Sequence, residues 1–151
     1  NNADFQPISN KSRVVAQYGY KYHYLGNIKP TLTATIPDLL CEIATAERLA
    51  PYITLNENLD QLIINKYATN QSISAHCDHV KFFGPVIACL SIGGSATATF
   101  TSIKRPLHKV SIKLEEKSLY IMTGKSRYEY KHEISKPTSD RYSLTYRSVN
   151  K

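Results

Sequence analysis

The sequence predicts a mainly β domain, an antiparallel sandwich or jelly roll with one flanking helix. The evidence is one helical pattern before residue 50 and a series of short strand patterns after Asp60, separated by turn residues or charges. One helix followed by many short strands is typical of such folds. The chain has 151 residues, of which 42% are hydrophobic, so we expect a single domain over residues 1–151. A first residue other than Met agrees with a domain trimmed from a longer chain.

The first part of the chain combines irregular and extended patterns. We expect no regular structure as far as Lys11. The segment RVVAQYGYKYHY, residues 13–24, is rich in β-branched and aromatic residues and predicts a strand or hairpin. Tyrosines at every second position of a strand share one face. These are Tyr18, Tyr20, Tyr22 and Tyr24.

The segment from Ile36 to Leu49 predicts the helix. Pro37 suits the first turn, and Asp38 places a negative charge near the positive end of the helix. Apolar residues at helical spacing form a stripe, and Pro51 ends the pattern.

The strand patterns after Asp60 are QLIINKY, PVIACLSI, ATATFTSI, KVSIKL, SLYIM and RYSLTYR. In KVSIKL, the alternation places Val110, Ile112 and Leu114 on one face. We expect turns at residues 93–94 and 123–125.

Charge and cysteine content restrict the partners and the compartment. The net charge is +7, and residues 61–151 hold 14 Lys and Arg against 6 Asp and Glu. A basic surface favours a polyanion such as nucleic acid, although lysines can also serve solubility alone. Three cysteines at irregular spacing form no disulfide framework, so we expect an intracellular protein, cytoplasmic or nuclear. No apolar run approaches the length of a membrane span, and we expect a monomer with no membrane association.

The stretch AHCDH, residues 75–79, contains an H-x-D pair. On a strand, His76 and Asp78 would point the same way and supply two ligands of a facial triad, which leaves metal positions open for reactants. Cys77 and His79 alternate with this pair and would point away from the metal. His132, in the segment YKHEI, is the best candidate for the third ligand. An isolated H-x-D pair is weak evidence, because such pairs occur by chance.

Two further strands strengthen the hypothesis. In RYSLTYR, one face holds two arginines and two hydroxyls, and an arginine fork suits a carboxylate. In LIINKY, an amide and a phenol share a face and could bond the same anion. The alternatives are a solvated edge strand and a tyrosine satisfied within the core. The residues concerned are Arg141, Ser143, Thr145, Arg147, Asn65 and Tyr67.

The order N-x-Y, H-x-D, distant His and R-x-S-x-T-x-R resembles the AlkB family of Fe(II)/2-oxoglutarate dioxygenases. The resemblance runs from about Arg13 to Val149. The local sequence is most similar to the subgroup that hydroxylates tRNA wobble uridines. It implies a double-stranded β-helix, a jelly-roll variant. It also implies that Fe(II) is bound by the catalytic residues His76, Asp78 and His132.

The resemblance also implies roles around the metal. The cosubstrates would be 2-oxoglutarate and O2. Arg141 would pair with the distal carboxylate of 2-oxoglutarate, Asn65 and Tyr67 would bond the cosubstrate, and Arg147 would lie near the metal-side carboxylate or the substrate. The remaining cosubstrate candidates on the same strand face are Ser143 and Thr145.

The expected function is oxidation of alkylated or modified bases in nucleic acid, as RNA or single-stranded DNA, with RNA favoured. One or two of the tyrosines and the cations near the site would bind the base and its phosphates, and the alternative is that the tyrosine segment packs on the core. Alternatives are an AlkB-like oxygenase that acts on a protein or small molecule, and a non-catalytic jelly-roll binding module. The substrate candidates are Tyr18, Tyr22, Tyr24, Arg13 and Arg127.

Overall fold

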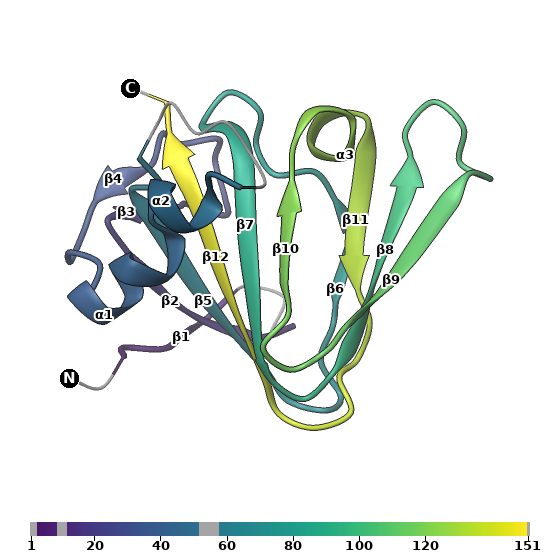
Figure 1. Cartoon of the computed structure of the whole chain (residues 1–151), viewed down its shortest axis with the longest axis horizontal. Coiled ribbons are helices and arrows are strands. Elements are labelled where there is room, and N and C mark those ends of the chain that lie inside the picture. Colours follow the sequence, from purple (N-terminus) through teal and green to yellow (C-terminus); the bar gives the residue numbers. More distant parts are fainter. Residues whose placement is uncertain (1–2, 9–11, 52–57, 151) are drawn as a thin grey trace.

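The computed structural model describes residues 3–8, 12–51 and 58–150. It is built mainly from antiparallel strands, as predicted, with a few short helices outside the sheets (Figure 1). The strands are β1 (Gln6–Pro7), β2 (Val14–Tyr18), β3 (Tyr20–Lys21), β4 (Thr31–Leu32), β5 (Gln61–Tyr67), β6 (Ile73–His76), β7 (Phe83–Gly93), β8 (Ala96–Ser102), β9 (Lys109–Leu114), β10 (Leu119–Met122), β11 (Tyr130–Ile134) and β12 (Arg141–Val149). The helices are α1 (Asp38–Cys41), the 3-10 turn η1 (Glu42–Ala44), α2 (Ala46–Leu49) and α3 (Gly124–Tyr128).

Two sheets form the body of the molecule. The larger sheet has the order β1-β2-β5-β12-β7-β10, and the smaller has the order β6-β11-β8-β9. Strands β3 and β4 form a separate pair beside the larger sheet (Figure 1). In the described part of the chain, no helix is long and apolar enough to cross a membrane.

The main core lies between the larger sheet and the helices. Leu62, Leu144 and Tyr146 are buried in it, and Leu40 and Ile43 of the helical segment pack against them. The Tyr146 hydroxyl also donates to the Leu40 carbonyl (3.0 Å). The helices therefore cover the outer face of the larger sheet, and its other face is left for the smaller sheet (Figure 1).

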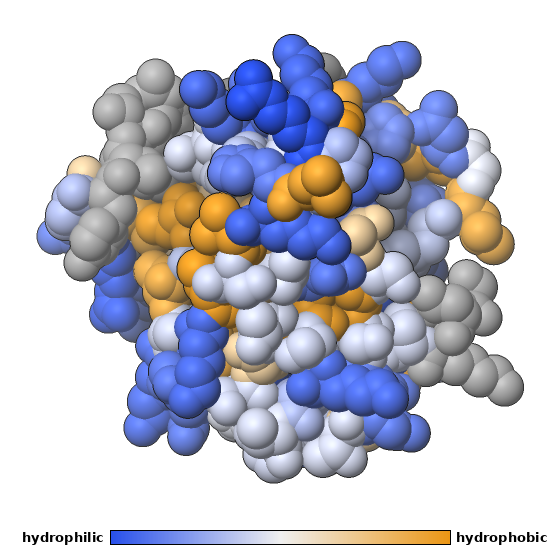
Figure 2. Space-filling model, turned by 90° about the vertical axis from the view of Figure 1, so that its right-hand side faces the viewer, coloured by the Kyte–Doolittle hydropathy of each residue, from blue (hydrophilic) through white to orange (hydrophobic). Residues whose placement is uncertain are grey.

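The six predicted strands after residue 60 are confirmed, with small shifts at their ends. The apolar face predicted for β9 is buried only in part, and β9 lies at the edge of the smaller sheet. Leu114 is buried, whereas Val110 and Ile112 remain exposed. Figure 2 shows this side of the molecule, where apolar side chains lie among polar ones.

The predicted helix over Ile36–Leu49 is broken into three short pieces. Thr45 is extended (φ −69°, ψ 151°), and its hydroxyl accepts a hydrogen bond from the Arg48 amide (3.3 Å). A threonine side chain that competes for backbone donors favours a helix start over a helix interior. The apolar stripe is confirmed at Leu40, Ile43 and Leu49, which pack in the main core. Leu39, predicted to belong to it, is 73% exposed, and the interruption at Thr45 was not predicted.

Two other local expectations are wrong. The opening segment contains a short strand, β1, which pairs with β2. Residues 123–125 lead into a helix rather than forming a simple turn, because the Thr123 amide donates to the Ser126 hydroxyl (3.1 Å) at the start of α3.

The four alternating tyrosines do not share one strand face. Gly19 separates β2 from β3 with φ +71°, and a Cβ at this position would lie 1.9 Å from the Asp60 carbonyl oxygen. The alternation is therefore broken after Tyr18, and Tyr22 and Tyr24 lie beyond the end of β3.

Candidate metal centre

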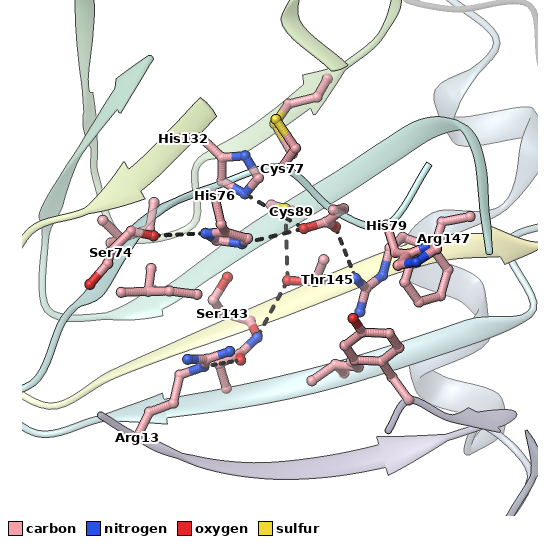
Figure 3. A pocket seen from close by; sticks show the side chains of 18 of the residues that line it. Arg13, Ser74, His76, Cys77, His79, Cys89, His132, Ser143, Thr145 and Arg147 are labelled. Carbon is pink, nitrogen blue, oxygen red and sulfur yellow. Dashed lines mark hydrogen bonds and ion pairs between the residues drawn. The ribbon is translucent and has the colours of Figure 1, made fainter. Parts of the chain in front are cut away.

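A cavity of about 420 Å³ lies between the two sheets (Figure 3). Its lining comes from β5, β7, β10 and β12 of the larger sheet and from β6 and β11 of the smaller sheet. The segments before β2, after β3 and after β6 complete it. Most of the residues singled out from the sequence line it: Arg13, Tyr22, Tyr24, Asn65, Tyr67, His76, Asp78, His132, Ser143, Thr145 and Arg147.

Two histidines lie side by side on neighbouring strands of the smaller sheet. His76 ends β6, and His132 is its register partner on β11. Their ring centroids are 4.3 Å apart. His132 is buried, whereas His76 is half-buried, and its Nδ1 lies 2.8 Å from the Ser74 carbonyl oxygen. The antiparallel ladder thus fixes both imidazoles at one place in the cavity.

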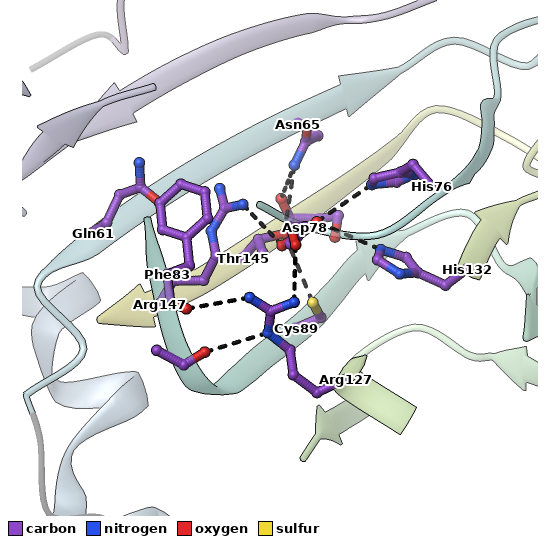
Figure 4. Close-up of polar contacts among 12 residues, drawn as sticks. Gln61, Asn65, His76, Asp78, Phe83, Cys89, Arg127, His132, Thr145 and Arg147 are labelled. Atoms are coloured by element: carbon purple, nitrogen blue, oxygen red, sulfur yellow. Dashed lines mark hydrogen bonds and ion pairs between the residues drawn. The ribbon is translucent and has the colours of Figure 1, made fainter. Parts of the chain in front are cut away.

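Asp78 approaches both histidines, but not from a strand. Strand β6 ends at His76, so the expectation that the H-x-D pair lies on a common strand face is wrong. The Asp78 Oδ1 is nevertheless 3.4 Å from the Nε2 of His76 and 3.8 Å from that of His132 (Figure 4). The potential ligand atoms of the three residues lie within 4.8 Å of one another.

An arginine holds the aspartate in place. The Arg147 Nη1 donates to the Asp78 Oδ2 at 2.9 Å, and both side chains are buried. The guanidinium also lies 4.2 Å from the centroid of the Phe83 ring. This charge pair leaves Oδ1 directed toward the histidines (Figure 4).

The electrostatics favour ligand forms of these side chains. Burial raises the pKa of Asp78, but Arg147 first, and then His76 and His132, outweigh it and lower that pKa well below its usual value. Burial lowers the pKa of His132 to about 4, although Asp78 opposes the shift. Asp78 is therefore ionised and His132 neutral near pH 7, and these are the forms that bind a metal.

The donor set fits an open transition-metal site. Two imidazole nitrogens and one carboxylate form the set of a facial triad, whereas a closed structural zinc site takes four ligands. No other group of this kind occurs within residues 3–8, 12–51 and 58–150. The Cys77 thiol donates to the Tyr130 carbonyl (3.2 Å), and the His79 Nε2 lies 2.7 Å from the Asn27 Oδ1, so neither belongs to the cluster.

Strand β12 has the two faces that its alternation predicts. Ser143, Thr145 and Arg147 line the cavity, and Leu144 and Tyr146 belong to the main core on the opposite face. Register pairing with both β5 and β7 places β12 inside the larger sheet rather than at its edge. The alternative of a solvated edge strand is therefore wrong.

Arg141, at the start of β12, is a buried cation with unused donors. It is 1% exposed, and its Nη2 donates to the Ser91 hydroxyl at 2.8 Å. Its Nε and Nη1 have no hydrogen-bond partner in the described part of the chain. The guanidinium lies 5.7 Å from the centroid of the Tyr67 ring, which lines the cavity. Buried unpaired donors are costly, so this fork is suited to an incoming anion.

Asn65 and Tyr67 share the cavity face of β5, as predicted. The Asn65 Oδ1 already accepts a hydrogen bond from Arg13 Nε (2.6 Å), so its amide nitrogen is the group directed to other acceptors, including the Ser143 carbonyl (3.4 Å). Burial raises the pKa of Tyr67 to about 12. Its hydroxyl therefore stays protonated at neutral pH and can donate a hydrogen bond.

The predicted substrate residues separate into two groups. Tyr22 and Tyr24 line the cavity with ring centroids 5.1 Å apart, and Arg13 lies 5.9 Å from the Tyr24 ring centroid. In contrast, Tyr18 packs against the main core, and Arg127 is buried and bonded to backbone carbonyls. Neither of these two residues lines the cavity of the metal cluster.

Two aromatic residues of the cavity were missed. Phe83 lies beside Tyr22, with ring centroids 5.4 Å apart, and Tyr120 reaches the cavity from β10. Alternation along SLYIM places Tyr120 and Met122 on one face, so this signal was present. Phe83 had no such signal, because it begins its strand.

The family model described as the 2OG-Fe(II) oxygenase superfamily matches residues 5–147. Among curated proteins, the chain is 35% identical over 139 residues to mouse "tRNA (carboxymethyluridine(34)-5-O)-methyltransferase ALKBH8", covering 89% of this chain but 20% of that protein. It is 39% identical over 62 residues to mouse "Alpha-ketoglutarate-dependent dioxygenase alkB homolog 7, mitochondrial", covering 41% of this chain and 28% of that protein. The chain thus spans about a fifth of the length of the first of these relatives.

A solved structure described as "The structure of OsALKBH1" superposes with a TM-score of 0.74 at 16% identity. The match covers 98% of this chain and 85% of that one. This likeness concerns the fold, and it confirms the predicted double-stranded β-helix of the jelly-roll type.

Proposed function

The chain belongs to the 2OG-Fe(II) oxygenase superfamily, and from this premise we propose that it oxidises alkylated or modified bases in nucleic acid. The relatives confirm the resemblance to the AlkB family and the assignment as a dioxygenase enzyme. The reaction on the base would be oxidative demethylation or hydroxylation, with RNA, including tRNA, favoured over DNA. The observation that supports this best is the cluster of His76, Asp78 and His132 in one cavity with Tyr22 and Tyr24.

The residues present fit the cofactors of this family. His76, Asp78 and His132 would hold Fe(II), and the unused donors of Arg141 suit the distal carboxylate of 2-oxoglutarate. When bound, iron, 2-oxoglutarate and O2 supply the oxidising power for attack on a C–H bond of the substrate.

The chain's own residues prepare this site. Arg147 keeps Asp78 ionised and fixes which oxygen faces the histidines. The protonated hydroxyl of Tyr67 and the amide nitrogen of Asn65 would donate to the cosubstrate. Ser143 and Thr145 add hydroxyls on the same wall.

Charge and aromatic residues support a nucleic-acid substrate. The net charge is +7, and the lysines and arginines are concentrated after residue 60. Tyr22 and Tyr24 offer rings to an unstacked base, with Arg13 beside Tyr24. One similar protein is named for a tRNA uridine. A base within a duplex would have to be flipped out to reach this cavity.

We also propose that the protein acts inside the cell as a monomer. Its three cysteines are all free, which suits a reducing compartment.

Succinate formation tests the oxygenase directly. The apo-protein is titrated anaerobically with Fe(II) and 2-oxoglutarate and then exposed to O2. We expect succinate from the parent and from a His108→Ala control, which changes an exposed histidine on the β8–β9 loop, and none from His76→Ala. Equal succinate from His76→Ala would remove this metal assignment.

Substrate class is tested separately, by binding to single-stranded RNA, single-stranded DNA and protein extracts at several salt concentrations. A nucleic-acid substrate predicts affinity that falls steeply as salt rises, since phosphate contacts release counterions. Turnover without nucleic-acid binding would favour a protein or small-molecule substrate for the same oxygenase.

A further inference from the structure

The segment that contains Asp78 has little backbone support of its own. It joins β6 to β7, and Asp78 lies two residues beyond the end of β6. The backbone bonds within it run from the amides of Phe82 and Phe83 to the His79 carbonyl, at 3.2 and 3.1 Å. The position of Asp78 must therefore be fixed by contacts from elsewhere in the chain.

Arg127 supplies such contacts. Its side chain is 2% exposed and reaches this segment from α3 (Figure 4). The Nη1 donates to the Asp78 carbonyl oxygen at 2.9 Å. The Nε and Nη2 donate to the carbonyls of Gly84 and Phe83, both at 3.3 Å. One guanidinium thus bonds both ends of the segment, from Asp78 to the first two residues of β7.

We propose that Arg127 is a positioning residue that holds the Asp78 segment in the conformation that binds the metal. This inference rests on the proposed metal centre. Arg127 does not touch the Asp78 carboxylate, which Arg147 binds. The two arginines have separate tasks: Arg147 sets the charge and orientation of the side chain, and Arg127 sets the path of the backbone.

Arg127 lies close in the chain to one metal-binding candidate and bonds the segment that contains another. Helix α3 leads directly into β11, where His132 lies five residues after Arg127 and pairs in register with His76. Any shift of α3 relative to the Asp78 segment would therefore change the distance from the aspartate to both histidines. Supporting groups around a metal site typically change metal affinity by about 10- to 100-fold when they are removed.

Lysine cannot replace this arrangement. A guanidinium has donors in a fixed planar fork, whereas an ammonium is a compact point charge. The Arg127 fork bonds three carbonyls on residues 78, 83 and 84, and one ammonium cannot reach all of them. The Arg127→Lys variant therefore tests the geometry while keeping the positive charge.

The experiment measures two properties of Arg127→Met and Arg127→Lys. The first is the affinity of the apo-protein for Co(II), as an air-stable probe, by calorimetry. The second is amide hydrogen exchange of residues 77–83 in the absence of metal. The matched control is Leu114→Ala, which removes a buried side chain of β9, at the opposite edge of the smaller sheet from β6, and lowers stability by a cavity.

We expect Co(II) affinity to fall by about tenfold or more in Arg127→Met and by less in Arg127→Lys. Exchange over residues 77–83 should accelerate in both variants, and Leu114→Ala should lower the melting temperature with Co(II) affinity unchanged. If Arg127→Met fails to fold, Arg127→Lys decides alone. Parental Co(II) affinity in the folded Arg127 variants would overturn the inference, and so would parental exchange over residues 77–83.

Failure of the proposed function has a different signature. If the parent binds no Co(II), the metal centre is wrong and the metal-positioning role of Arg127 is wrong with it. If the parent binds Co(II) and the folded Arg127 variants bind it equally well, only the role of Arg127 is refuted.

Discussion

The candidate metal centre contains two regions that are held in different ways. His76 and His132 are register partners in an antiparallel ladder, so the smaller sheet fixes their separation. Asp78 lies outside any strand and is held by side chains, through Arg147 at its carboxylate and Arg127 at its carbonyl. The smaller sheet therefore positions the two histidines, and two buried arginines position the aspartate.

The difference teaches that removal of a ligand has different consequences in the two regions. When a histidine on a paired strand is truncated, the backbone hydrogen bonds of that strand remain. Removal of the aspartate leaves the buried Arg147 charge without its partner, which is costly in itself.

Asp78→Ala should lose both metal binding and stability. Breaking a buried ion pair typically costs about 3 kcal/mol or more, because one charge is left uncompensated. His76→Ala should lose metal binding at a much smaller cost in stability. Denaturant unfolding of the two apo-variants measures the contrast. The double variant Asp78→Ala, Arg147→Met should regain stability without regaining the metal, and an equally unstable double variant would refute the explanation.

The pH dependence of the free energy of unfolding should distinguish the contribution of His132 on its strand from that of Asp78 on its loop. The folded pKa of His132 is lowered from 6.5 to about 4, so the unfolded chain binds its proton first as pH falls. The free energy of unfolding of the apo-protein should therefore rise between pH 4 and 6.5, by on the order of 3 kcal/mol. The stability from Asp78, whose folded pKa is also lowered, is present above about pH 4 and is lost below it.

Urea unfolding across this pH range measures the effect. A His132→Asn variant should have a much shallower slope between pH 4 and 6.5. An unchanged slope in that variant would show that other groups cause the pH dependence.

Arg141→Lys should affect the cosubstrate and leave the metal alone. The variant keeps the charge but loses the planar fork, whose Nε and Nη1 are unused in the described chain. Loss of a charged hydrogen bond costs about 1.5–3 kcal/mol, so the KM for 2-oxoglutarate should rise on the order of tenfold or more. Co(II) affinity should stay at the parental value. A parental KM would place the cosubstrate carboxylate elsewhere.

Tyr22→Ala and Tyr18→Ala compare two tyrosines that the sequence pattern treats alike. Tyr22 lines the cavity, and Tyr18 packs on the main core. A stacked base contributes about 1–3 kcal/mol, so Tyr22→Ala should weaken binding to single-stranded RNA by about tenfold. Tyr18→Ala should lower the melting temperature with RNA affinity unchanged. Equal RNA affinity in the two variants would exclude Tyr22 from the substrate site.

The features that could be predicted from the sequence lie on regular strands. The alternation in RYSLTYR gave both faces of β12, and LIINKY gave the facing residues of β5, because both strands lie in the larger sheet with unbroken register. The choice of His132 agreed with the structure, since few histidines were available. These predictions required only the period of a strand.

The remaining features depend on contacts between distant parts of the chain. The H-x-D spacing was interpreted as a strand, whereas Asp78 meets the histidines through a loop held by arginines. Arg127 was assigned to the substrate because charge alone does not reveal burial. Tyr18 was separated from Tyr22 by the left-handed conformation at Gly19. Local periodicity contains none of this information.

Metal stoichiometry tests directly whether the two histidines on paired strands and the aspartate on the loop form one Fe(II) site. Anaerobic calorimetry with Fe(II) should give one ion per chain for the parent and for His79→Ala, whose ring lies outside the cluster. His76→Ala, Asp78→Ala and His132→Ala should each lose measurable binding. Parental affinity in any of these three folded variants would contradict the account.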